Sequence, residues 1–141
     1  VIAAKNAAAL REMNEIIKLR KVHKYYLALA DKAVEYGCDE ICVKDMSGVG
    51  KPAFIAELIS RIKKQYPAVP IQYHSHGGPN FSEKSILEAA RAGVDYIDVA
   101  VQPLAWGKGH PEVGAVRTML VKDGVLVKDI DNQAYNKGVE V

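Results

Sequence analysis

The chain has 141 residues, of which 49% are hydrophobic and 26% are charged. This is the composition of an ordinary globular domain with one hydrophobic core. Its 19 basic and 17 acidic residues give a formal net charge of +2, which argues against nucleic acid or an anionic membrane as the main partner. No apolar run approaches the roughly 20 residues of a membrane span, and no signal-peptide pattern is present. The cysteines, Cys38 and Cys42, are too few for a disulfide framework, so we expect a reducing, cytoplasmic location.

Residues 1–36 contain neither glycine nor proline and are rich in strong helix formers. Apolar side chains recur at helical spacing, for example at Leu10, Met13 and Ile17. The pattern predicts one long helix or two abutting helices. Gly37 then ends the helical segment as the residue after its C-cap.

From residue 38 onward the pattern alternates between β-rich runs and amphipathic helical stretches. Short turns that contain glycine or proline separate them. Such alternation favours parallel strands joined by right-handed crossovers, in a doubly wound sheet or a (β/α)8 barrel. The strands are expected at residues 40–46, 71–76 and 96–101, and the helices at 53–66, 82–92 and 111–121.

The tail, residues 122–141, is polar, and Val125–Val127 is its one weak strand candidate. A complete (β/α)8 barrel needs about 250 residues. Because only three clear strands are predicted here, a barrel fold implies a piece of a barrel, or one that another chain completes.

The first chemical signal is the run Tyr73-His74-Ser75-His76. Residues i and i+2 of a strand point to the same face, so both imidazoles are expected to converge at the end of this strand. Two neutral imidazoles in that arrangement suit a divalent metal such as Zn, Mn or Co. The alternative is a polar strand end that is exposed to solvent.

The second signal is Lys44, which directly follows the apolar residues 41–43. Burying an unpaired ammonium group is costly. Lys44 therefore either reaches solvent, pairs with an acid such as Asp45, or has been made nucleophilic or converted into a metal ligand. Strand alternation places Lys44 on one face with Cys42 and Met46. Because ligands bind at the carboxyl ends of parallel strands, Lys44 and Met46 are expected near the two histidines.

The remaining candidates are weaker. Asp98, on the third strand, either faces the same edge or pairs with a neighbouring lysine. Trp106 and His110 lie in the glycine-rich loop that follows. Both could contact a ligand, but we favour the interpretation of His110 as a solvated loop residue. Residues 48–51 lack the full spacing of a phosphate-binding loop and are interpreted as a strand-to-helix turn.

Three motifs resemble one family. They are C-V-K-D-M at residues 42–46, Y-H-S-H-G-G at 73–78, and G-V-D-Y-I-D-V-A-V-Q-P at 93–103. Together they resemble the carboxyltransferase domain of biotin-dependent enzymes, a group that includes pyruvate carboxylase, the oxaloacetate decarboxylase alpha subunit and the transcarboxylase 5S subunit. The resemblance covers about residues 22–121.

The resemblance implies a TIM barrel that moves CO2 between biotin and the methyl carbon of pyruvate. Its divalent metal polarises the keto acid and stabilises the enolate. Carried over to this chain, His74 and His76 are the imidazole ligands, and Lys44 is a carbamylated ligand with a catalytic role. Met46 is expected to line the pocket for biotin or the keto acid, together with Gly77.

This chain also departs from the family pattern. A first-strand aspartate, the fourth ligand, has no counterpart here, and the proton-shuttling threonine is expected beyond Val141. Gly77 stands where the family usually has aspartate, and residues 1–21 have a helical pattern where a strand is expected.

We therefore expect an α/β fold, a partial TIM barrel with three or four βα units after a long helix. The expected divisions are a helical segment at 1–37, a half-barrel at 38–121 and a tail at 122–141. The expected partners are the rest of the barrel or another chain, a biotin carrier protein or domain, a keto-acid substrate and further copies of the chain, with neither nucleic acid nor membrane insertion.

Two other functions remain open at this stage. One is a metal-dependent lyase or aldolase of the hydroxymethylglutaryl-CoA lyase type, which also uses an H-x-H motif but needs no lysine carbamate. The other is a non-catalytic α/β remnant that oligomerises through its unclosed sheet edges.

Overall fold

The computed structural model describes residues 8, 11, 23–78 and 81–140, which fall into two compact units divided after Cys38. In the first unit, helix α2 spans His23–Glu35. Gly37 follows it with a φ of +78° and donates its amide hydrogen to the Val34 carbonyl at 2.9 Å. The predicted helix end at Gly37 is confirmed, whereas most of the helix predicted before residue 23 lies outside the described residues.

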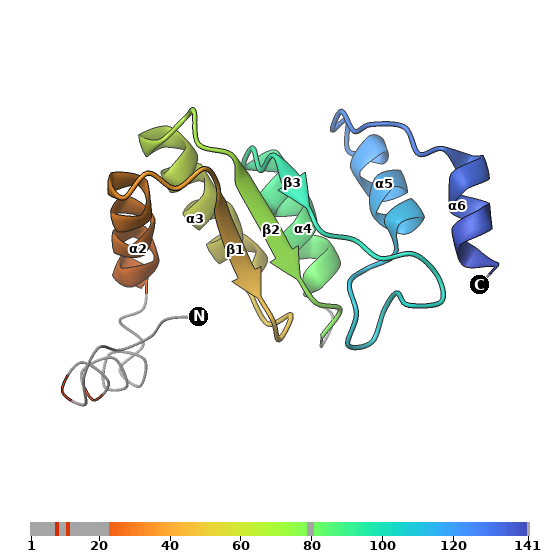
Figure 1. Ribbon diagram of the computed structural model, residues 1–141, viewed down its shortest axis with the longest axis horizontal. Helices are drawn as coiled ribbons and strands as arrows, with labels where there is room; N and C mark the ends of the chain where they lie inside the picture. Colours follow the sequence, from red (N-terminus) through yellow and green to blue (C-terminus); the bar gives the residue numbers. More distant parts are fainter. Residues whose placement is uncertain (1–7, 9–10, 12–22, 79–80, 141) are drawn as a thin grey trace. The chain divides into compact units, whose positions relative to one another are not determined.

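The second unit contains a parallel sheet with the strand order β1-β2-β3 (Figure 1). The strands are β1 at Ile41–Asp45, β2 at Ile71–Ser75 and β3 at Tyr96–Ile97. The helices are α3 at Pro52–Gln65, α4 at Ser82–Arg91, α5 at Val113–Lys122 and α6 at Asn132–Val139. The predicted alternation of parallel strands and helices is confirmed.

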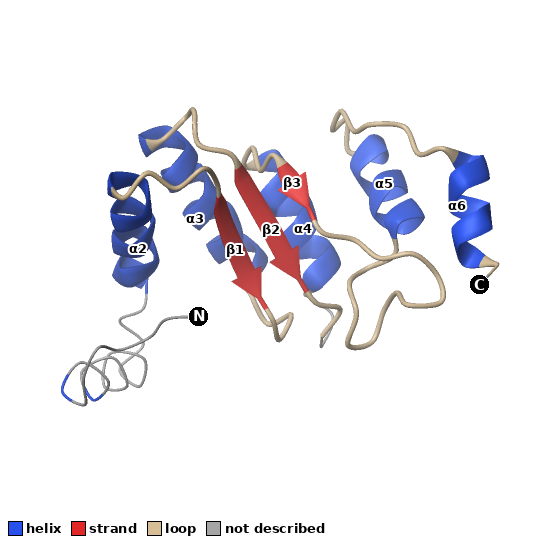
Figure 2. Cartoon of the chain, viewed as in Figure 1, coloured by secondary structure: helices blue, strands red, loops and turns tan. Residues whose placement is uncertain are grey.

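Helices α3 and α4 cover one face of this sheet (Figure 2). Helix α3 begins with Pro52 in its first turn, as predicted. It buries Ile55, Leu58, Ile59 and Ile62, the spacing of one helix face. In β2, the side chains of Ile71 and Tyr73 point to the face that the helices cover, and both are fully buried. The core is therefore a helix-on-sheet layer.

Within the described residues of the second unit, the opposite face of the sheet is open. Cys42, Lys44 and Met46 share that face, as strand alternation predicted, and all three are exposed. Of the possibilities left open for Lys44, the structure shows a side chain that reaches solvent, because only the face that carries Ile41 and Val43 is turned toward the helices. In a closed barrel, the open face would be the interior.

The third strand is shorter than predicted. It ends at Ile97, after which Ala100 forms a parallel bridge with Glu112. The Glu112 carboxylate accepts the amide hydrogens of Gly114 and Ala115 at 2.8 and 2.7 Å. This cap makes α5 begin at Val113, two residues later than predicted.

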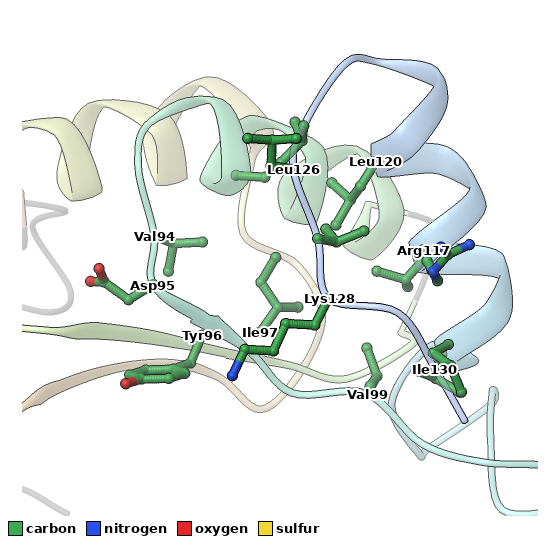
Figure 3. A pocket seen from close by; sticks show the side chains of 15 residues that line it. Val94, Asp95, Tyr96, Ile97, Val99, Arg117, Leu120, Leu126, Lys128 and Ile130 are labelled. Atoms are coloured by element: carbon green, nitrogen blue, oxygen red, sulfur yellow. The ribbon is translucent and has the colours of Figure 1, made fainter. Parts of the chain in front are cut away.

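The tail also differs from the prediction, because Val125–Val127 forms no strand. Residues 125–128 and 130 instead line a groove of about 380 Å³ beside β3 and α5 (Figure 3). Leu120 and Leu126 lie in its apolar part. Helix α6 follows this segment, and no described helix is both long and apolar enough to span a bilayer.

Candidate metal centre

The H-x-H motif lies at the carboxyl end of β2, where His74 and His76 face each other. Their Nε2 atoms are 3.1 Å apart, and their ring centroids are 5.0 Å apart. The motif therefore brings two imidazoles together on one face, as the alternation of side chains in a strand requires.

The other ring nitrogen of each histidine is hydrogen-bonded to an acceptor. His74 Nδ1 lies 2.6 Å from an Asp98 carboxylate oxygen, and His76 Nδ1 lies 2.6 Å from the Lys108 carbonyl oxygen. A carboxylate and a carbonyl only accept hydrogen bonds, so each neutral imidazole carries its proton on Nδ1. Both Nε2 lone pairs are then free to bind a ligand.

Two free lone pairs at 3.1 Å repel each other unless a proton or a metal cation lies between them. Metal–imidazole bonds of about 2.0–2.1 Å place neighbouring ligand nitrogens about 3.0–3.4 Å apart. The separation between His74 and His76 lies within that range. Histidine ligands in metal sites characteristically donate their second N–H to a carboxylate or a carbonyl, as both rings do here. The donor set therefore fits a divalent transition metal.

Asp98 orients the first imidazole. It faces the candidate site and contacts His74 and Gln72, whose side-chain amide nitrogen lies 2.6 Å from the other carboxylate oxygen. Of the two possibilities left open for Asp98, the structure supports the one that faces this edge. Burial opposes ionisation of Asp98, but the hydrogen bonds from Gln72 and His74 outweigh it and lower the pKa of its carboxyl group.

The structure adds a third imidazole, that of His110. Its ring centroid lies 4.5 Å from that of His74 and 4.6 Å from that of His76. One ligand atom from each of the three rings lies within 4.8 Å of the others. Our interpretation of His110 as a solvated loop residue is wrong, because the loop after β3 folds back over the end of β2.

Glycine allows that loop to approach. The Gly77 amide donates to the Gly109 carbonyl at 2.7 Å. A Cβ atom on Gly77 would lie 2.9 Å from the Gly107 carbonyl oxygen. Any side chain at position 77, including an aspartate, would therefore push this loop away from the two histidines.

The loop after β1 supports the site from the other side. The Asp45 carboxylate accepts the amide hydrogens of Val49 and Gly50, and the Asp45 carbonyl accepts that of His76. Gly48 has a φ of +61°, and a Cβ atom there would lie 2.3 Å from the His76 carbonyl oxygen. The loops after all three strands thus pack backbone to backbone around the histidines.

Lys44 lies on the strand next to the H-x-H motif, and Met46 directly follows that strand. Lys44 is the register partner of His74 on the neighbouring strand, and its side chain is exposed. Met46 follows β1 and is 59% exposed. The metal-ligand role of Lys44, like the pocket roles of Met46 and Gly77, stays a prediction.

The sequence of this chain matches one protein-family model over nearly its whole length. The model described as HMGL-like matches residues 3–137, nearly the whole chain. The chain belongs to the HMGL-like family. The resemblance to biotin-dependent carboxyltransferases is also confirmed, since relatives named pyruvate carboxylase match it. The mitochondrial enzyme of Rattus norvegicus is 34% identical over 66% of this chain, and a pyruvate carboxylase subunit from Methanocaldococcus jannaschii is 37% identical over 64%.

A solved structure of the carboxyl transferase domain of Rhizobium etli pyruvate carboxylase, with pyruvate and biocytin, is also similar to the chain. It has a TM-score of 0.64 and 33% identity over 70% of this chain. The match spans only 16% of that structure, and 8% and 16% of the two sequence relatives. This HMGL-like chain therefore corresponds to a part of the carboxyltransferase domain, and its fold is the matching part of a TIM barrel.

Proposed function

We propose that this chain forms the metal-binding part of a biotin-dependent carboxyltransferase barrel and is incomplete on its own. The observation that carries the proposal is the pair of Nε2 atoms of His74 and His76, which face each other 3.1 Å apart while both Nδ1 atoms are held by acceptors. Homology to the pyruvate carboxylase domain supports the type of reaction.

His74 and His76 would hold the divalent metal, with Zn, Mn and Co as the chemical candidates. A carbamylated Lys44 would add an anionic oxygen ligand from the adjacent strand. When bound, the metal supplies a Lewis acid for the carbonyl group of a keto acid. The residues of the chain then have two tasks: Asp98 keeps the His74 ring in orientation, and Met46 and Gly77 border the space for keto acid or biotin.

The described residues supply three strands of the barrel. Among the described strands, β1 and β3 each pair only with β2, which leaves two parallel-strand edges. The open face also exposes the side chains of Met46 and Tyr96. Such edges and apolar groups favour covering by further protein. We expect the missing barrel strands or a second copy of the chain to cover them, with a biotin carrier as the transient partner, in a reducing compartment such as the cytoplasm.

Elemental analysis of the natively purified chain tests the metal assignment. Near one equivalent of a divalent transition metal is expected in the wild type and almost none in a His74→Ala/His76→Ala variant. His23→Gln is the matched control, because His23 is the fourth histidine of the sequence and belongs neither to the H-x-H motif nor to the loop that carries His110. A metal-free wild type, or one whose metal survives the double substitution, would refute the assignment.

A lyase of the hydroxymethylglutaryl-CoA type is the second candidate. The matching family model carries the HMGL-like description, and the side chain of Lys44 is exposed. NMR of the metal-loaded chain in 13C-bicarbonate separates the two functions. A carbamate carbon signal that disappears in Lys44→Met supports the carboxyltransferase, because the lyase needs no lysine carbamate.

A further inference from the structure

His110 lies outside the H-x-H motif but has the same type of environment as the two motif histidines. Its Nδ1 atom lies 2.8 Å from the carbonyl oxygen of Ser75, a fully buried residue in β2. A carbonyl only accepts, so the proton of the neutral ring sits on Nδ1. Nε2 is therefore the ring nitrogen whose lone pair is left to bind a metal.

All three imidazoles thus share one pattern. Asp98, the Lys108 carbonyl and the Ser75 carbonyl each hold one Nδ1 atom. This pattern fixes the tautomers and the orientations of all three rings before any ligand arrives. Three such rings with ligand atoms within 4.8 Å of one another form a preorganised donor set.

Lys44 is a poorer third ligand than His110 in this chain. An ammonium group has no lone pair, so Lys44 must first react with CO2 to become a carbamate ligand. The structure gives Lys44 an exposed side chain on the open sheet face. His110 needs no modification, is half-buried and already lies against the other two rings.

We propose that His110 is a metal ligand, so that His74, His76 and His110 form a three-imidazole site that binds metal without modified Lys44. This inference rests on the proposed metal site at His74 and His76. Three neutral imidazoles suit Zn²⁺ and Co²⁺ better than Mn²⁺, which prefers oxygen ligands. Three protein ligands also leave a position open for water or substrate, as in catalytic zinc sites.

Cobalt titration of the full chain in CO2-free buffer tests the proposal. Visible absorption of bound Co²⁺ reports both affinity and ligand geometry. We expect His110→Phe to weaken Co²⁺ binding at least tenfold and to change the spectrum, whereas His23→Gln leaves both unchanged. Co²⁺ binding that persists in His110→Phe with wild-type affinity and spectrum would overturn the inference while leaving the site at His74 and His76 intact.

A measurement on the wild type avoids the risk that His110→Phe misfolds. In proton NMR of the Co²⁺-loaded chain, each coordinated imidazole gives one strongly shifted, exchangeable Nδ1–H signal. Three such signals support the inference, and two overturn it. Wild-type protein that binds no more Co²⁺ than the His74→Ala/His76→Ala variant would instead refute the proposed metal site, and this inference with it.

Discussion

The hydrogen bond between Asp98 and His74 gives the most informative prediction about the metal site. At 2.6 Å between Oδ2 and Nδ1, it is a short, charge-assisted bond, and the second carboxylate oxygen accepts from Gln72 at the same distance. Asp98→Asn preserves the shape and allows both contacts after the Gln72 amide rotates, but it removes the charge. Asp98→Ala removes both contacts and frees the ring of His74.

The two variants should therefore weaken metal binding in a graded way. A hydrogen bond to a charged group contributes about 1 kcal/mol more than a neutral one, so Asp98→Asn should lower the affinity about fivefold. Loss of an outer-shell partner typically lowers metal affinity about 10–100-fold, which is the range expected for Asp98→Ala. Equilibrium dialysis against Zn²⁺ measures both values.

Asp123 provides the matched control, because it pairs with Arg91 instead of a histidine. Asp123→Asn and Asp123→Ala should leave Zn²⁺ affinity at the wild-type value. If Asp98→Ala binds Zn²⁺ as tightly as the wild type, the reasoning that Asp98 orients a ligand imidazole is wrong. Equal losses in the Asp98 and Asp123 series would point to a general change in stability instead.

Three further predictions concern the scaffold. Gly48→Ala puts a methyl group 2.3 Å from the His76 carbonyl oxygen. The control is Gly124→Ala, because Gly124 also has a positive φ but has open space around its Cα. Gly48→Ala should lower the free energy of unfolding by about 1–3 kcal/mol more than Gly124→Ala does, and equal urea midpoints of the two variants would contradict this. Glu112→Ala removes the N-terminal cap of α5 and should lower the free energy of unfolding, measured by thermal unfolding, by about 1 kcal/mol. Glu112→Gln should lower it by less. Burial opposes ionisation of Asp95, but Lys63 and a backbone amide outweigh it and lower the pKa of its carboxyl group. The resulting stabilisation, at most about 1 kcal/mol for this partly exposed pair, is present above the ordinary aspartate pKa of about 3.9 and is lost as the pH falls below it. The difference in unfolding free energy between wild type and Asp95→Asn should therefore vanish in acid.

Local periodicity explains why much of the fold could be predicted from sequence. The buried stripe of α3 and the alternation in β2 are patterns within single elements, and each follows from the geometry of that element. The convergence of His74 and His76 follows from the same two-residue repeat. These features depend on neighbours in sequence, so the sequence carries them directly.

The position of Lys44 illustrates what local patterns miss. Its apolar neighbours suggested burial, but a strand covered by helices on one face needs apolar residues only on that face. Val43 faces the helices while Lys44 faces away from them. Whether the open face is covered depends on protein that the local sequence does not describe.

The length of β3 has a similar cause. Residues 98–101 continue the apolar alternation, yet the Ala100 amide donates to the Pro111 carbonyl and the Val113 amide donates to Ala100. The Asp98 amide still donates to the Tyr73 carbonyl of β2, but from Ala100 onward the backbone pairs with the returning end of its own loop. This pairing fixes both ends of the loop that carries His110, which is why a residue remote in sequence arrives beside β2.

The supports of the three imidazoles all lie close to the sheet's carboxyl end. His74 is held through Asp98, His76 through Lys108, and His110 through Ser75. None of these contacts requires a strand beyond β2 and β3 and the loop that follows. Lys44, by contrast, sits on the open face, where its environment depends on what covers that face. The imidazole part of the site is therefore expected to form in this chain alone, whereas any carbamate chemistry at Lys44 and the binding of keto acid or biotin depend on the protein that completes the barrel.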